Sequence, residues 1–248
     1  MPDPILIEIG FLKIRWYGVL IAAAILVGTF LALKEIKKKN IDEDKFMNVL
    51  LTAIPVAFIS ARLYYVAFNW DYYSLNPGEI PAVWNGGLAI HGGIIGAFSV
   101  AWIMLKYYKI SFWQVADAVA PSMVLGQAIG RWGNYFNQEA YGYEVDPVSV
   151  PWAMWIDGAY RHPTFLYEFL WNIGVFFLLI LIREKFKLKE GLLLAIYLGG
   201  YSIGRFFIEG FRTDSLMLGS LRMAQVTSLI FIIISIVLYI YLSRKKIS

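Results

Sequence analysis

Polar residues gather in one short stretch of this otherwise apolar sequence, just past the middle of the chain. Arg131, Asn134 and Asn137 are three residues apart, so in a helix they would lie along one side. Gly126 and Gly130, four apart, would let another helix approach the backbone closely. An arginine among apolar residues must be paired or face a wet cavity, so this stretch is the first candidate functional site.

A second polar grouping lies in a later apolar segment. Tyr201, Arg205, Glu209 and Arg212 are separated by four, four and three residues, which places them on one helix face. One interpretation is a structural Arg205–Glu209 pair that only locks two helices together. The other is a functional site, because an arginine in such a segment seeks a partner.

A histidine with glycine neighbours is the third candidate. His91 precedes Gly92, Gly93 and Gly96, and an imidazole near neutral pH is suited to take a proton. A lone buried histidine is more often a packing residue than a catalyst. The glycines leave room for a ligand or for another helix, and both remain open. The other histidine, His162, is interpreted as structural or interfacial.

Two weaker signals lie at the ends of apolar segments. Tyr17 opens the first segment within the sequence Arg-Trp-Tyr-Gly, and Arg62 closes the second with Tyr64 and Tyr65. Tryptophan and tyrosine at such ends are most often residues of the membrane interface.

The composition is that of a membrane protein, with 59% hydrophobic and 16% charged residues. A soluble domain carries about 25% charged residues. The chain has no cysteine and two isolated histidines, so we expect no disulfide, no metal site and no cysteine nucleophile. It also has no phosphate-binding loop, dinucleotide fingerprint or serine elbow, so we expect no cofactor. Without a basic segment before the first apolar run, we expect no cleaved signal peptide.

Seven apolar segments are each close to the roughly 20 residues that cross a bilayer. They fall near residues 16–33, 46–68, 88–105, 112–131, 165–182, 192–210 and 223–242. The sequence therefore predicts an all-α integral membrane protein of about seven transmembrane helices. We expect a single polytopic membrane domain over residues 1–248, with an interfacial arm at 1–15 and an outer loop segment at 143–163, for which anchoring at the interface is one interpretation.

Lysine and arginine predict the orientation, because the richer side is cytoplasmic. One set of loops holds 14 of the 22 cations: Lys34, Lys37, Lys38, Lys39, Lys45, Lys106, Lys109, Arg183, Lys185, Lys187, Lys189, Arg244, Lys245 and Lys246. The other side holds Lys13, Arg15, Arg62, Arg131, Arg161, Arg205, Arg212 and Arg222. We therefore expect an outside N-terminus and a cytoplasmic C-terminus.

The two sets differ in kind, since the inner set is mostly lysine and the outer set is mostly arginine. Arginine offers a planar fork that binds phosphate through two hydrogen bonds, which suggests an anionic group handled on the outer side. Arginines that extend to lipid headgroups from helix ends are the alternative.

The expected topology also places the polar residues at one depth. Tyr17, Arg62, His91, Arg131, Asn134, Arg205 and Glu209 come from different segments, yet all fall in the outer half of the membrane. The simplest account is one polar chamber that opens to the outer leaflet and could bind a lipid phosphate as a leaving group.

The signature from residue 130 to residue 142 resembles that of the bacterial prolipoprotein diacylglyceryl transferases. Seven positions in thirteen are specified: Gly130, Arg131, Gly133, Asn134, Asn137, Glu139 and Gly142. The resemblance also covers the Arg-Trp-Tyr-Gly sequence, the glycines around His91, and the segment from Gly204 to Glu209, so it extends over most of the chain.

The resemblance implies transfer of the sn-1,2-diacylglyceryl group of phosphatidylglycerol to the lipobox cysteine of a prolipoprotein in the bacterial cytoplasmic membrane. A thioether forms and glycerol phosphate leaves. The implied partners are phosphatidylglycerol, lipobox peptides and membrane lipids, and no nucleic acid is expected. The implied catalytic residues are His91, Arg131 and Arg205, and the implied substrate-binding residues are Tyr17, Arg62, Asn134, Asn137, Glu139, Tyr201 and Glu209.

Each implied residue has a role in this hypothesis. Arg131 and Arg205 would bind the phosphate and its departing charge, with Glu209 orienting Arg205. Tyr17 and the two asparagines would bind the headgroup or glycerol, and Glu139 would order the outer end of the signature. His91 would be the base for the thiol, unless neighbouring guanidinium groups lower the thiol pKa enough to make a base unnecessary.

Three other functions compete with this interpretation. A transporter for an anionic solute would also carry intramembrane arginines, but it predicts polar residues along the inner halves of the helices. A structural subunit leaves the outer polar residues unexplained. Another enzyme acting on lipid headgroups is the nearest rival, and the signature decides against it.

Overall fold

The computed structural model describes residues 3–10 and 12–244 and is mainly helical. Its helices are α1 (Trp16–Lys38), α2 (Glu43–Phe68), α3 (Trp70–Leu75), α4 (Ile90–Tyr107), α5 (Phe112–Asn137), α6 (Thr164–Lys185), α7 (Leu192–Glu209) and α8 (Met223–Arg244), with short 3-10 turns η1 (Pro77–Glu79) and η2 (Val83–Asn85). Its strands are β1 (Ile5–Ile9), β2 (Leu12–Arg15), β3 (Met154–Ile156), β4 (Ala159–Arg161), β5 (Met217–Leu218) and β6 (Leu221–Arg222). The strands pair in sequence order into three antiparallel hairpins.

The long helices match the seven apolar segments predicted from the sequence. Six of them are long and apolar enough to cross a membrane: α1, α2, α4, α6, α7 and α8. The protein is therefore an all-α, multi-pass membrane protein, as predicted. The seventh long helix, α5, carries the polar signature, which lowers its hydropathy, and it extends to Asn137, six residues beyond the predicted end. Arg131, Asn134 and Asn137 therefore do share one helix.

Contacts divide the chain into two compact units. Unit 1 contains the described residues up to Lys34 and from Ala116 onward, and unit 2 runs from Glu35 to Val115. Unit 1 therefore holds nearly all of α1 and α5 together with α6, α7 and α8. Unit 2 holds α2, α3 and α4.

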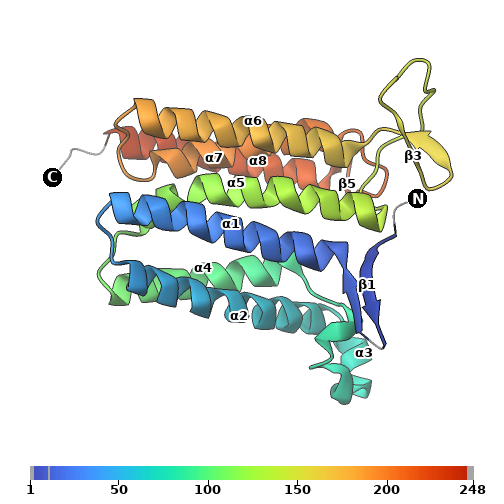
Figure 1. Ribbon diagram of the computed structural model, residues 1–248, viewed down its shortest axis with the longest axis horizontal. Coiled ribbons are helices and arrows are strands. Elements are labelled where there is room, and N and C mark those ends of the chain that lie inside the picture. Colours follow the sequence, from blue (N-terminus) through green and yellow to red (C-terminus); the bar gives the residue numbers. More distant parts are fainter. Residues whose placement is uncertain (1–2, 11, 245–248) are drawn as a thin grey trace. The chain divides into compact units, whose positions relative to one another are not determined.

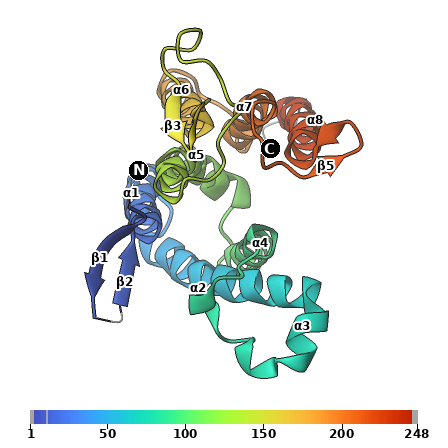
Figure 2. The same ribbon diagram turned by 90° about the vertical axis from the view of Figure 1, so that its right-hand side faces the viewer.

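Helices of unit 1 run lengthwise beside one another, with α5 next to both α1 and α6, and α7 next to α8 (Figures 1 and 2). The three hairpins lie at one end of these helices. The basic residue Lys185 ends α6 at the opposite end, and Lys187 and Lys189 follow it. One end of unit 1 is thus elaborated by loops while the other carries lysines.

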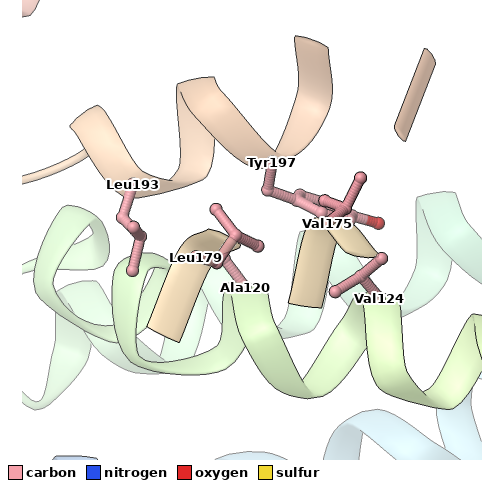
Figure 3. Packing of buried hydrophobic residues seen from close by; sticks show 6 residues of the cluster. All are labelled: Ala120, Val124, Val175, Leu179, Leu193 and Tyr197. Atoms are coloured by element: carbon pink, nitrogen blue, oxygen red, sulfur yellow. The ribbon is translucent and has the colours of Figure 1, made fainter. Parts of the chain in front are cut away.

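A buried apolar cluster joins α5, α6 and α7. It consists of Ala120, Val124, Val175, Leu179, Leu193 and Tyr197 (Figure 3). Asp117, one turn before Ala120 on α5, accepts hydrogen bonds from the backbone N–H groups of Gly191 and Leu194 at 2.7 and 2.8 Å. A carboxylate at a helix N-terminus is stabilised by the helix dipole, so Asp117 anchors the start of α7.

Glycine determines how closely α6 approaches α7. A Cβ atom on Gly204 would lie 2.1 Å from the indole of Trp171, and Trp171 Nε1 donates to the Gly200 carbonyl at 2.8 Å. Trp171 thus lies flat against α7, where its only polar atom is bound. These glycines bring into contact the two helices that carry the candidate site.

In unit 2, glycines bring α4 against α2. A Cβ on Gly92 would lie 2.4 Å from the Ser60 carbonyl oxygen and from Tyr64 Cβ, and one on Gly96 would lie 2.2 Å from Ser60 Oγ. The glycine surface beside His91 is therefore occupied by another helix, which answers the question left open by the sequence.

The two irregular segments of the prediction contain hairpins. The expected N-terminal arm folds into β1 and β2, and the expected outer segment 143–163 contains β3 and β4. Residues 1–2 and 11 of the arm, and Lys245 and Lys246 of the basic set, lie outside the described residues.

Candidate functional site

A buried carboxylate on α6 links arginines from α5 and α7. Glu168 Oε1 lies 2.7 Å from Arg205 Nη1, and Glu168 Oε2 lies 3.0 Å from Arg131 Nε. The first contact is a hydrogen bond, whereas the Arg131 Nε–H is not aligned with the oxygen and has no hydrogen-bond partner. The arginines of the two separate sequence groupings therefore meet around one side chain in unit 1.

The end of α7 adds further charges to this arrangement. Glu209 Oε2 lies 2.7 Å from Arg205 Nη2, and Arg212, three residues beyond Glu209, lies 3.8 Å from the same carboxylate and 3.9 Å from Glu168. Asp214 accepts two hydrogen bonds from Arg212, at 3.0 and 2.8 Å. Three arginines thus balance three carboxylates; we refer to these six residues as the arginine network.

Burial alone would raise the pKa of Asp214, but the two hydrogen bonds and the charge of Arg212 lower it below its ordinary value of 3.8. Asp214 therefore stays ionised at neutral pH and occupies one face of the Arg212 fork. Arg131 and Arg205 are the guanidinium groups of the network that face carboxylates without such a two-bond pairing.

Exposure within the network is uneven in a way that matters for binding. The side chains of Glu168 and Glu209 are each 4% exposed, while those of Arg131 and Arg205 are 20% and 17% exposed. The carboxylates therefore lie behind the guanidinium groups. A guanidinium has five N–H donors, so both arginines retain donors on their more open side.

The signature side chains continue the network toward the end of α5. Arg131 Nη1 and Asn134 Oδ1 are 3.5 Å apart, and the Asn134 and Asn137 amides donate to Glu139 Oε1 at 3.0 and 3.2 Å. Glu139 thus fixes the amide orientation of both asparagines, which leaves the Asn134 oxygen directed at Arg131.

The turn after α5 explains how Glu139 points back to its own helix. Gln138 and Ala140 have φ angles of 52° and 60°, a left-handed conformation that residues other than glycine rarely adopt. The Glu139 N–H donates to the Asn134 carbonyl, and the Thr164 hydroxyl at the start of α6 donates to the Ala140 carbonyl. Strained backbone of this kind collects at functional sites.

Two tyrosines complete the candidate site in unit 1. Tyr17, at the start of α1, lies against Gly133, where a Cβ would be 2.3 Å from the Tyr17 ring. The signature glycine therefore makes room for Tyr17. Tyr201 lies one turn before Arg205 on α7, and the centroid of its ring is 6.2 Å from that of the Tyr197 ring.

Arg222, at the start of α8, holds the segment that carries Arg212. It donates to the Gly210 and Arg212 carbonyls at 2.5 and 2.8 Å, and to the Tyr143 hydroxyl. The segment is also paired with the loop after α5, since the Tyr143 N–H donates to the Phe211 carbonyl at 3.0 Å. Arg222 is thus bound to protein groups, in contrast with the extension to headgroups considered from the sequence.

Arg62 and His91 belong to unit 2. Arg62 is 5% exposed and donates four hydrogen bonds of 2.7–2.9 Å to the carbonyls of Glu79, Ile80, Gly86 and Gly87. The two glycines have φ angles of 86° and 74°, which glycine alone adopts readily. Arg62 therefore holds the loop that leads into α4, at whose first turn His91 lies exposed.

Sequence reasoning missed Glu168 and Asp214. Glu168 lies in the apolar segment 165–182, which was treated only as a membrane-spanning run. The signal was present, since an acidic residue in such a run must be paired. Asp214 follows α7 in a loop, and its pairing with Arg212 depends on a turn that spacing does not reveal.

The chain was compared with known proteins. A family model described as prolipoprotein diacylglyceryl transferase matches residues 4–241. The chain belongs to the prolipoprotein diacylglyceryl transferase family. Among its relatives, phosphatidylglycerol–prolipoprotein diacylglyceryl transferases from Clostridium novyi, Listeria monocytogenes serotype 4b and Geobacillus kaustophilus are 53%, 50% and 50% identical to it. Each match covers 98% of this chain and 97%, 91% and 93% of the relative, respectively.

The resemblance inferred from the signature is thus confirmed, and the family is one of transferases. Membership of the prolipoprotein diacylglyceryl transferase family decides against the transporter and the structural subunit. The arginine network lies where this family's signature on α5 meets α6 and α7.

Proposed function

We propose that the protein transfers the sn-1,2-diacylglyceryl group of phosphatidylglycerol to the lipobox cysteine of prolipoproteins, releasing glycerol phosphate. This is the first step of lipoprotein maturation. The reaction takes place in the bacterial cytoplasmic membrane, with the site in the outer half of the bilayer. Its substrates are phosphatidylglycerol and the prolipoprotein, in a protein surrounded by membrane lipids.

The arginine network is the observation that carries the proposal. It gathers Arg131, Arg205 and Arg212 at the end of unit 1 that bears the hairpins, in a family whose named members act on phosphatidylglycerol. Arginine forks match the oxygen geometry of a phosphodiester. A permanent positive charge is also suited to a leaving group that gains negative charge as the bond breaks.

In this proposal the cysteine sulfur of the prolipoprotein attacks the carbon of the diacylglyceryl group that is bonded to a phosphate oxygen. The carbon–oxygen bond breaks, glycerol phosphate leaves with the electron pair, and a thioether remains. Arg131 and Arg205 bind the phosphate through donors directed away from their carboxylates, while Glu168 and Glu209 hold them in place. Their positions are supported by contacts with carboxylates of the protein itself, so little reorganisation is required.

The remaining residues of the site orient the headgroup. Asn134 and Asn137, fixed by Glu139, and Tyr17, held against Gly133, supply hydrogen-bonding groups on the α5 side. Tyr201 supplies a hydroxyl on the α7 side. These groups suit the glycerol hydroxyls of phosphatidylglycerol, which both donate and accept hydrogen bonds.

We propose His91 as the group that accepts the thiol proton, since its imidazole is exposed at the start of α4. Arg62 is proposed to act indirectly, by holding the loop that precedes His91. Turnover of a His91→Gln variant tests the first role. Full retention of turnover would mean that guanidinium charge alone ionises the thiol.

The decisive experiment uses the purified protein in phospholipid vesicles with labelled phosphatidylglycerol and a lipobox peptide. We expect a diacylglyceryl thioether with the cysteine peptide and none with a peptide whose cysteine is replaced by serine. Phosphatidylethanolamine labelled in the same position serves as the headgroup control. Equal transfer from both lipids, or transfer to the serine peptide, would contradict the proposal.

A further inference from the structure

An apolar groove runs along α6 beside the end of α7. It has a volume of about 840 Å³. Leu170, Gly174 and Leu178 line it on α6 at intervals of four, which places them on one helix face. Ile208 and Phe211 line it from α7 and the residues that follow. At ~1.5 Å per residue, the stretch from Leu170 to Leu178 extends over roughly 12 Å.

The few polar atoms along the groove already have partners. Trp152 Nε1 donates to Tyr167 Oη at 2.7 Å, and Tyr167 Oη lies 2.9 Å from His162 Nδ1, where the hydroxyl can donate. Trp171 Nε1 is bound to the Gly200 carbonyl. An occupant of this groove is therefore not required to supply hydrogen bonds.

The groove begins beside the arginine network. Its lining residue Trp171 lies one turn after Glu168 on α6, and its lining residue Ile208 lies one turn after Arg205 on α7. A molecule lying in the groove would therefore have one end within a helical turn of the arginine network. The arrangement combines an anion-binding end with an apolar channel.

Gly174 provides the depth of the groove. A Cβ atom on Gly174 would have no other atom within 4 Å, so the space in front of it is open. Glycine is unfavourable in a helix interior, and here no close helix contact requires it. A larger side chain at this position would fit without a clash and would project into the groove.

We propose that this groove holds an acyl chain of the lipid substrate, and that Gly174 sets the room available to that chain. The inference rests on the proposed function and names the part of the protein that contacts the hydrocarbon. A hydrocarbon chain matches an apolar channel in membrane-spanning helices that starts at a phosphate-binding group. Because the bilayer is equally apolar, the groove acts through shape and packing, which position the chain.

The kinetic test compares phosphatidylglycerols with long and with short acyl chains as donors to the lipobox peptide. Gly174→Leu lowers kcat/KM for the dioleoyl lipid by about tenfold or more, since a displaced chain misplaces the reacting carbon. For the dioctanoyl lipid the decrease stays within about twofold, because a short acyl chain does not need the part of the groove that the leucine at position 174 fills.

Two variants control for side effects. Gly174→Ala adds little volume and should behave like the native protein. Phe231→Trp enlarges an exposed side chain on α8, away from the residues that line the groove, and should leave the ratio between the two lipids unchanged. Equal losses for both lipids in Gly174→Leu would overturn the inference, because they would indicate a disturbed fold.

A binding test separates this inference from the proposed function. Phosphatidylglycerol with a photoreactive diazirine in one acyl chain should crosslink to residues 170–178, and Gly174→Leu should reduce that crosslink. Crosslinking of the groove by a diazirine-bearing lipobox peptide instead would assign it to the prolipoprotein and overturn the inference. Absence of transfer with intact lipid crosslinking would refute the proposed function and leave the groove assignment standing.

Discussion

Glu168 illustrates how a single ionised side chain can be kept inside an apolar helix. Its carboxylate is 4% exposed and lies within ion-pair distance of Arg131, Arg205 and Arg212. Removing one partner of a buried ion pair leaves the remaining charges uncompensated, which is strongly destabilising. In the proposed mechanism Glu168 is therefore a positioning residue, which orients the arginines and does not contact the reacting atoms.

Replacing Glu168 by glutamine should reduce transfer by about 100-fold or more, because the arginines lose the charge that fixes their orientation. It should also lower the free energy of unfolding by roughly 3–5 kcal/mol. Transfer rates in vesicles and thermal unfolding in detergent measure the two effects.

The control is Glu184→Gln, which changes an exposed glutamate at the other end of α6. It should leave both measurements near those of the native protein. Native transfer by Glu168→Gln would show that Arg131 and Arg205 need no carboxylate to position them.

Substitutions of Arg131 test whether a positive charge alone is sufficient for transfer. Arg131→Lys keeps a positive charge but loses the planar fork, so transfer should fall by about 100-fold or more. Arg131→Ala should abolish transfer while the protein remains folded and inserted in the membrane. Near-native activity with lysine would mean that phosphate binding through two hydrogen bonds is not part of the mechanism. Membrane fractionation and the vesicle assay measure these outcomes.

At the residue scale, the sequence was informative where spacing within one helix decides neighbours. The Arg205–Glu209 pair and the shared face of Arg131 and Asn134 follow from intervals of four and three. Contacts between helices, such as Glu168 with Arg131, depend on which faces pack together, and spacing contains no such information. The partners of Arg62 are likewise not predictable from spacing, because they are carbonyls of a loop that folds around its side chain.

At the scale of elements, α6 and α7 determine how the network is assembled. Trp171 lies against Gly204 and donates to the Gly200 carbonyl, so the close approach of these helices depends on glycine, which has no side chain, at position 204. Small residues serve this purpose in membrane proteins because close packing replaces the hydrophobic effect between helices.

Gly204→Ala should therefore force Trp171 away from α7. The added Cβ would lie 2.1 Å from the indole, and overpacking of this kind costs about 1–3 kcal/mol. Transfer should also fall, because Glu168 lies one turn from Trp171. Thermal unfolding measures the loss of stability, and the vesicle assay measures the loss of transfer.

Gly174→Ala is the matched control, since the same change is made on α6 in open space. It should leave stability unchanged or slightly raised. Equal destabilisation by both substitutions would show that the Gly204 contact has no special role.

At the scale of the whole chain, the distribution of lysine and arginine predicts which end of unit 1 faces the cell interior. The hairpins lie at one end of its helices, and at the other end Lys185 closes α6 and is followed by Lys187 and Lys189. The seven long helices were predictable from length and apolarity, apart from the extension of α5, whereas the short helix α3 and the two 3-10 turns were not predicted. The hairpins and the left-handed turn after α5 were not, because they depend on contacts between loops.

The orientation can be measured directly, because the chain contains no cysteine. A cysteine introduced at Val148, which is exposed in the outer segment, should react with a membrane-impermeant maleimide on intact cells stripped of their wall. A cysteine at Lys187 should react only after the membrane is opened. The reverse pattern would invert the topology and place the site on the cytoplasmic side.

The contacts of Arg222 have a consequence for biogenesis. This residue lies where α8 begins, yet it holds the carbonyls of Gly210 and Arg212 at the end of α7. The ribosome delivers Arg222 and α8 after α7, so a nascent chain that ends before Arg222 lacks these two hydrogen bonds to the segment that carries Arg212. The transferase should therefore become competent only on completion of the polypeptide, and shortened products should insert into the membrane without acquiring activity.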